Sequence, residues 1–335
     1  MGVYIIRRLL LAVVVLIGMS VFTFLISHAV PGDPVSLAAG PHAGPEQIEN
    51  LRKALGYDKP LPAQYFIYIS GLLRGDWGVS ISTGRPVAQD LKAFLPATIE
   101  LAVFALIFAV LLGIPLGILS AVKRNSLLDH GARVVSLIGA SIPIFWLGLL
   151  LVLLFYKQLK LLPISGRIGT GINPPAGISG FYLLDSVLSL DWIAFRSSLS
   201  HIILPAITLG YASMGAFTRM SRSSVLEVLG TDYIRTARAK GLREFFVIYK
   251  HALRNAILPI MTLTGLQFAN LLGGAVLVET IFSWPGIGSY GVNAIMNLNF
   301  PAIMGVTLTV TMIFVIINLI TDLCYAIADP RIVFK

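Results

Sequence analysis

The sequence contains few motifs that could bind a nucleotide or support catalysis, and the clearest match lies in the wrong context. Gly286-x-Gly288-x-x-Gly291 has the spacing of a dinucleotide-binding fingerprint. However, it follows an apolar segment of helical length instead of a strand, and no acidic residue stands about 20 positions further on. We therefore predict a packed turn there, with Trp284 near a membrane interface.

Other signatures of catalysis or of a bound cofactor are missing from the sequence. It has no GxxxxGKS or GxxxxGKT phosphate-binding loop, no HExxH, no paired CxxC and no GxSxG motif, and its five histidines are scattered. We therefore predict a non-catalytic chain with no metal site and no cofactor of its own. Any ATP would be bound by another subunit.

Polar side chains inside apolar segments are the remaining candidates for contact with a solute, because charges at membrane depth are costly and usually face protein or water. Glu100 and Glu279 stand at the ends of such segments, where they could line a solute path or instead reach headgroups and loops. Gln267 and Asn270, about one helical turn apart, could contact another helix or a solute. Asp322 is deeper, and a structural pairing explains it better.

The composition requires lipid as part of the solvent. Apolar residues make up 56% of the chain and charged residues 12%, against about 45–50% and 25% in soluble domains. Six windows of about 20 apolar residues could each cross a bilayer as a helix. They are Leu9–Val30, Ala97–Leu119, Val134–Phe155, Ile202–Met220, Ala256–Val278 and Ile303–Ala328. Several contain a proline, which helix bundles tolerate, at Pro115, Pro143, Pro205 and Pro259.

The first window could instead be a cleaved signal peptide. Arg7 and Arg8 precede it, and Ser27-His28-Ala29 resembles a cleavage site. Its apolar stretch is longer than the roughly 15 residues of a signal core, so we predict an uncleaved first span.

The distribution of Lys and Arg predicts the orientation, because these residues are retained on the cytoplasmic side. If both termini are cytoplasmic, the inward-facing segments are 1–8, 120–133, 219–255 and 326–335. Lys and Arg are denser in these segments than in the outward-facing ones. The predicted organisation is a first span (1–30), a small external domain (31–96), a five-span core (97–328) and a cytoplasmic tail (329–335). The external segment has six basic and six acidic residues, as expected of a domain rather than a retained loop.

The net charge of +9 does not indicate nucleic-acid binding, because no segment combines a basic face with stacking aromatic residues. The charge is concentrated in one inner loop, where residues 219–255 carry eight Lys or Arg against three acids. Thr231 or Asp232 could cap a helix that runs through Lys240, and Gly241 could supply the left-handed residue that ends it. A second helix could start near Arg243. We therefore predict a cytoplasmic helix–turn–helix within residues 221–255.

This helix–turn–helix has features of a docking element. Tyr233, Ala237 and Gly241 stand four apart, which would form a strip of decreasing side-chain size that another backbone could approach. The alternative is a solvated basic loop that only sets the topology. Charge density alone does not require the glycine or the small-residue strip, so these features favour docking.

Part of this loop resembles a known family. The residues that carry the resemblance are Arg235-Thr236-Ala237-Arg238-Ala239-Lys240-Gly241 and His251-Ala252-Leu253-Arg254-Asn255. They are similar to the cytoplasmic loop of the dipeptide and oligopeptide permeases among bacterial ABC importers. The general pattern in such permeases is E-A-A, three residues, Gly, nine residues, then I-x-L-P. The chain keeps Ala237, Gly241 and Leu253, and its departures from that pattern resemble the peptide branch's own version.

Three further segments are similar to signatures of the same branch, so the resemblance covers nearly the whole chain. They are Pro31-Gly32-Asp33-Pro34, Ser283-Trp284-Pro285-Gly286 and Asp329-Pro330-Arg331. The resemblance implies an all-α integral membrane protein with the six-span bundle of a type I ABC importer permease, in the bacterial cytoplasmic (inner) membrane. It also implies a non-catalytic subunit that forms half of the path for dipeptides or oligopeptides.

The partners are implied by the same resemblance. A homologous second permease subunit would complete the path, two ABC ATPase subunits would bind ATP and Mg²⁺, and an extracytoplasmic solute-binding protein would deliver the solute. The residues implied in coupling to an ATPase are Tyr233, Arg235, Thr236, Ala237, Lys240, Gly241, Leu242 and Arg243.

Two alternatives concern the energy source and the solute. An ion-gradient-driven secondary transporter usually shows paired halves and midplane ionisable residues, whereas this sequence has one long unpaired inner loop and few buried charges. The same permease role could also serve nickel complexes, glutathione or another small solute. The sequence does not decide among solutes, because selectivity would reside largely in the binding protein.

Overall fold

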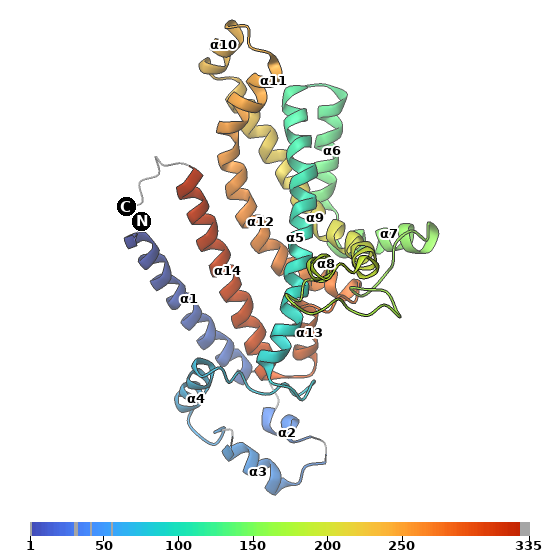
Figure 1. Ribbon diagram of the computed structural model, residues 1–335. Helices are drawn as coiled ribbons and strands as arrows, with labels where there is room; N and C mark the ends of the chain where they lie inside the picture. Colours follow the sequence, from blue (N-terminus) through green and yellow to red (C-terminus); the bar gives the residue numbers. More distant parts are fainter. Residues whose placement is uncertain (1, 30–32, 41, 55, 329–335) are drawn as a thin grey trace. The chain divides into compact units, whose positions relative to one another are not determined.

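The protein is built from helices joined by loops. This computed structural model describes residues 2–29, 33–40, 42–54 and 56–328, and within these ranges the only strand pairing is an isolated bridge between Val79 and Pro86. The prediction of an all-α protein is confirmed. Figure 1 shows the helices in chain order. The chain forms two compact units, one from residues up to Ala97 with 285–315, the other from 98–284 with residues from Ile316 onward.

Within the described residues, five helical runs are long and apolar enough to cross a membrane. They are α1 (Gly2–Ala29), α5 (Val87–Val122), α9 (Trp192–Leu229), the run from α11 (Glu244–Phe246) through the π-helix η2 (Val247–Ala252) into α12 (Leu253–Ile281), and α14 (Phe300–Ala328). Each covers one predicted window, except that Val30 at the end of the first window lies outside the described residues. All five begin before their windows, for example α5 at Val87 and α9 at Trp192, because an apolar window marks the part that lipid can cover and not the ends of the helix.

The third predicted window, Val134–Phe155, is not one continuous span. The structure has α6 (Leu127–Ser141), then α7 (Ile144–Leu151) running into the π-helix η1 (Val152–Gln158), with a bend of 109° between the two parts. Figure 1 shows α7 turning away from α6. Pro143 accounts for the break, since it holds Ile142 extended (φ −77°, ψ 126°) and cannot donate a helical hydrogen bond. The bent pair counts as a sixth span only if both parts are taken together.

The first unit contains the segment predicted as an external domain. After α1 come three short helices, α2 (Pro34–Ala39), α3 (Pro45–Ala54) and α4 (Leu61–Leu73). Asp33 caps α2 by accepting from the Val35 amide at 3.1 Å, and Arg52 of α3 donates to the same carboxylate at 2.5 Å. The Ser36 hydroxyl, which donates to Asp33, and the Arg52 guanidinium together lower the pKa of this carboxyl group.

The glycine motif lies in a helix of this unit. Gly286 is the N-cap residue of α13 (Ile287–Met296), and Gly288 and Gly291 are buried within that helix. The expected turn is therefore limited to the residues before Ile287. Trp284 is only 1% exposed, so the protein itself covers the ring. Its place near a membrane interface stays a prediction.

Glycines allow close packing of α5, α6 and α9 in the second unit. A Cβ atom at Gly117 of α5 would lie 2.5 Å from the carbonyl oxygen of Thr218, and one at Gly113 would lie 2.7 Å from that of Met214, both on α9. On α9, a Cβ at Gly215 would lie 2.7 Å from the Ser136 oxygen of α6. Small residues let helices approach to backbone contact in a membrane protein. The short α8 (Tyr182–Leu188) precedes α9.

Substituting Gly117 by Ala is expected to destabilise the protein by about 1–3 kcal/mol, because the new methyl group must push α5 away from α9. The matched control is Gly273→Ala in α12, where a Cβ meets nothing within 4 Å. The midpoints of thermal unfolding of the two purified variants in detergent measure the difference. Equal midpoints would contradict the close helix contact.

Candidate functional site

The inner loop forms the predicted helix–turn–helix. Helix α10 (Asp232–Ala239) follows the end of α9, and α11 and η2 lead back into α12. Figure 1 shows α10 and α11 together beyond the ends of α9 and α12. Thr231 occupies the N-cap position, but its side chain does not cap the helix, because its hydroxyl donates to the Val228 carbonyl at 2.6 Å. The predicted side-chain cap is therefore wrong, although the helix begins where predicted.

Gly241 ends α10 in the predicted left-handed conformation, with φ +74°. The Leu242 amide bonds back to the Ala237 carbonyl at 3.4 Å, which closes the turn. Across the turn Arg238 donates twice to Glu244, at 2.6 and 3.2 Å. The hydrogen bonds to Glu244 raise the pKa of Arg238, and the pair links the two sides of the turn.

A small apolar core fastens α10 to the rest of the inner end. Ile234, Ala237, Val247 and Ala252 are buried together, with side chains from the end of α9 packed beside them. Ala237 therefore faces inward and lets α10 lie close to η2. Because Ala237 is covered, the predicted strip of Tyr233, Ala237 and Gly241 is not one open surface.

The remaining implied coupling residues are all exposed, on α10 and on the turn that follows it. We call this the α10–α11 surface, and it consists of Tyr233, Arg235, Thr236, Lys240, Gly241, Leu242 and Arg243. Three aromatic residues that follow this surface, Phe245, Phe246 and Tyr249, are exposed as well, Phe245 to 63%. Exposed aromatic residues among basic ones are typical of a protein interface rather than of a solvated loop.

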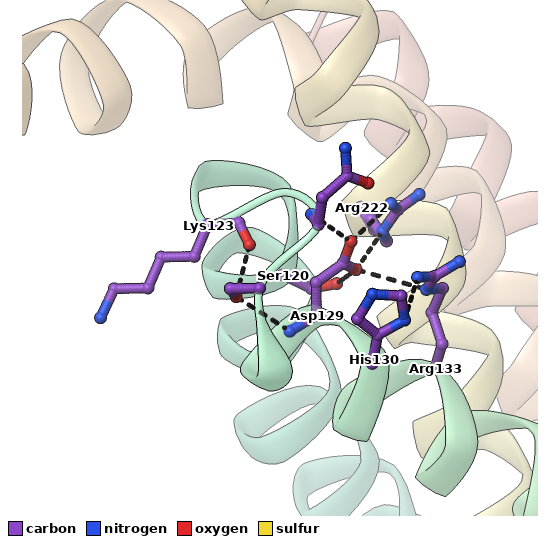
Figure 2. A network of polar contacts seen from close by, with 8 residues as sticks. Ser120, Lys123, Asp129, His130, Arg133 and Arg222 are labelled. Atoms are coloured by element: carbon purple, nitrogen blue, oxygen red, sulfur yellow. Dashed lines mark hydrogen bonds and ion pairs between the residues drawn. The ribbon is translucent and has the colours of Figure 1, made fainter.

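A second feature of the inner end was missed by sequence reasoning. Asp129, in the first turn of α6, is 0% exposed and binds several donors (Figure 2). Arg222 of α9 donates to it from Nε at 2.8 Å and from Nη2 at 3.0 Å. Ser120 of α5 donates at 2.6 Å, and the Asn125 amide at 2.9 Å. One signal was present in the sequence: Asp129 is the only acid in the inner segment 120–133.

The residues predicted to line a solute path are placed in different surroundings. Glu100 is 3% exposed and accepts from Arg167 Nη2 at 2.5 Å and from the Leu183 amide at 2.9 Å. The guanidinium of Arg167 lies 3.7 Å from the ring centre of Tyr182. In this structure the Glu100 carboxylate therefore anchors the segment between η1 and α8 and is withdrawn from solvent.

Glu279, Gln267 and Asn270 belong to α12 and have three different environments. Glu279 is fully buried and accepts from the Thr98 hydroxyl at 2.6 Å. Gln267 is half-buried and accepts from Ser213 of α9 at 2.8 Å, whereas Asn270 is exposed. The structure does not gather the four predicted residues into one site, and only Asn270 presents an open side chain. The side chain of Asp322 lies outside the described residues.

Comparisons with known proteins decide the family. Residues 113–334 match the model of the binding-protein-dependent transport system inner membrane component, and residues 1–102 match its N-terminal companion model. The chain belongs to this family of permeases. It is 49% identical to the probable D,D-dipeptide transport system permease protein DdpB of Escherichia coli strain K12, over 96% of this chain and 94% of that protein. It is 46% identical to the dipeptide transport system permease protein DppB of Alkalihalophilus pseudofirmus, over 98% of both chains.

A solved structure supports the fold of the permease. A chain of the MetNI methionine ABC transporter, in an inward-facing conformation, superposes with a TM-score of 0.51 and 16% identity, covering 70% of this permease and 93% of that chain. This likeness shows the type I importer fold and nothing about the solute. Family and apolar helices together make the permease a multi-pass protein of the inner membrane with a transport role.

Proposed function

We propose that this permease forms half of the translocation path of an ATP-driven importer of dipeptides or oligopeptides. A second, homologous permease completes the path, two ATPase subunits bind ATP and Mg²⁺, and an extracytoplasmic binding protein delivers the peptide. The permease relatives that support the peptide assignment are named for dipeptide transport. Both termini lie in the cytoplasm, residues 31–96 form the external domain, 97–328 the core, and 329–335 an inner tail.

The single observation that carries the coupling role is the α10–α11 surface. Its basic and apolar side chains are exposed, while its underside is fixed to the end of α9 and to η2 by a buried core. A partner that docks there moves α9 and α12 with it, because no flexible linker separates the surface from these helices. Closure of the ATPase pair would thus change access to the path, and the permease would perform no chemistry on the solute.

Polar residues along α12 and at its external end are the proposed contacts of the path. Asn270 is the most accessible of them, and Gln267 is half-buried. Glu279, and Glu100 of α5, are buried in this structure and would contribute only after a change in helix packing. The alternating-access cycle supplies such a change, because an inward-facing and an outward-facing path expose different faces of the same helices.

Reconstitution with defined partners tests the proposal. We expect proteoliposomes holding both permeases, both ATPases and the peptide-loaded binding protein to take up radiolabelled dialanine only when ATP is present. Proteoliposomes without ATPases are the control, with a proton or sodium gradient imposed. Uptake driven by the gradient in that control would rule out the coupling role. ATP-dependent uptake of labelled nickel or glutathione, with no uptake of dialanine, would keep the importer and reject the peptide assignment.

A further inference from the structure

The cytoplasmic ends of α5, α6 and α9 meet at a buried ion pair that the α10–α11 surface does not contact directly. Figure 2 shows Asp129 of α6 enclosed by Ser120 from α5 and Arg222 from α9. Arg133 lies further out, with Nε 3.6 Å from the carboxylate. One carboxylate thus joins three helices, and both of its oxygens accept hydrogen bonds.

The other contacts between α5 and α9 restrain separation more than sliding. The glycine contacts at Gly113 and Gly117 set how closely α5 approaches α9, and an apolar cluster including Ile118 and Val225 adds burial. Apolar contact is not directional, so it resists separation more than sliding or rotation. A guanidinium bound to a carboxylate through two parallel hydrogen bonds has a fixed geometry, and it therefore sets the register of α9 against α6.

The position of this pair suits a mechanical role. Arg222 stands about two turns, roughly 10 Å, before the end of α9 at Leu229, and the core beneath α10 includes side chains from that same end. A force on α10 is therefore passed to the end of α9 as well as to η2. Arg219, one turn earlier, donates to the Ser136 carbonyl of α6 at 2.8 Å, which adds a second link along the same line.

We propose that Asp129, through Arg222 and Ser120, is a positioning residue that makes α5, α6 and α9 move as one block when the α10–α11 surface is displaced. This inference rests on the proposed coupling role of that surface. Without the pair, α9 slips against α5 and α6, so that ATP hydrolysis continues but drives the path less effectively.

The test uses the purified complex of both permeases with both ATPases, and the variant Asp129→Asn, which keeps the side-chain shape and removes the charge. We expect basal ATP hydrolysis and complex yield close to those of the wild type. Two quantities should each fall about tenfold: the stimulation of ATP hydrolysis by the dialanine-loaded binding protein, and dialanine uptake per assembled complex. A roughly tenfold change corresponds to the loss of a typical coupling free energy between two sites. Glu227→Gln is the matched control, because it removes an exposed carboxylate from α9.

Two further variants keep the inference testable if Asp129→Asn assembles poorly. The double variant Asp129→Asn with Arg222→Gln leaves no unpaired charge in the buried site and should still lose stimulation. Arg222→Lys keeps the charge but not the paired hydrogen bonds, and it should lie between the wild type and the double variant. The positioning role of Asp129 would be overturned if the double variant showed wild-type stimulation of ATP hydrolysis and wild-type dialanine uptake per complex. This holds whatever the yield of assembled complex.

The outcome also separates this inference from the proposed function. If Gly241→Trp uncouples transport from ATP hydrolysis and the Asp129 variants do not, the α10–α11 surface couples to the ATPases but the positioning role of Asp129 is wrong. If Gly241→Trp leaves ATPase binding and uptake unchanged, the coupling role itself fails, and with it the premise for Asp129.

Discussion

Replacing Gly241 by Trp is expected to abolish ATP-driven uptake while the permease still inserts into the membrane. Gly241 lies on the exposed α10–α11 surface, and a Cβ atom there meets nothing within 4 Å, so an indole ring would project toward any docked partner. A loss of about 3 kcal/mol of docking free energy would lower coupled uptake at least about 100-fold. Co-purification of the ATPases with the variant, and dialanine uptake by the reconstituted complex, measure the effect.

The backbone at Gly241 requires a control, because its φ of +74° is unfavourable for most side chains. A non-glycine residue in this conformation costs about 1–2 kcal/mol, whereas Asn adopts it more readily. We therefore expect Gly241→Asn to keep the turn and to reduce uptake by only a few-fold. Normal recovery of the ATPases with Gly241→Trp would refute docking at this surface; equal losses in both variants would assign the effect to the turn instead.

Replacing Arg167 by Met should cost about 3–5 kcal/mol of stability, because it leaves the buried Glu100 carboxylate without its cation. The same change removes the hydrogen bond from Arg167 to the Gly180 carbonyl at 2.9 Å and the contact with Tyr182. We expect a lower midpoint of thermal unfolding in detergent and a lower yield of inserted protein.

Two controls isolate the ion pair as the cause. Arg196→Met removes an exposed arginine near the start of α9 and should leave the midpoint nearly unchanged. The double variant Glu100→Gln with Arg167→Met removes the unpaired charge and should recover most of the loss. A double variant no more stable than Arg167→Met alone would show that packing of the arginine, and not its charge, matters at this position.

The helix–turn–helix shows which features a sequence determines locally. Gly241 is left-handed and α10 begins at Asp232, as the spacing of capping and turn residues predicted. These outcomes depend on the backbone preferences of a few neighbouring residues, so they can be read without knowledge of the fold. The spans could be located for a similar reason, because hydropathy over about 20 residues is a property of one segment.

The side-chain pairs show what sequence reasoning could not reach. Asp129 and Arg222 are 93 residues apart, and Glu100 and Arg167 are 67 apart. Whether two such residues meet depends on how each helix is rotated about its axis, and one residue of error turns a side chain by about 100°. Glu100 was for this reason named as a path candidate without its partner Arg167, with which it forms a buried ion pair.

By itself, therefore, the sequence determined residence in a membrane, the apolar windows, and the inner helix–turn–helix with its resemblance to peptide permeases. Only the tertiary structure decided that the third window breaks before Pro143, that Ala237 faces inward, and that Asp129 joins three helices. The physical reason is the same in each case. Hydropathy and turn preferences are local, whereas the direction in which a helix presents its side chains is set by the neighbours against which it packs.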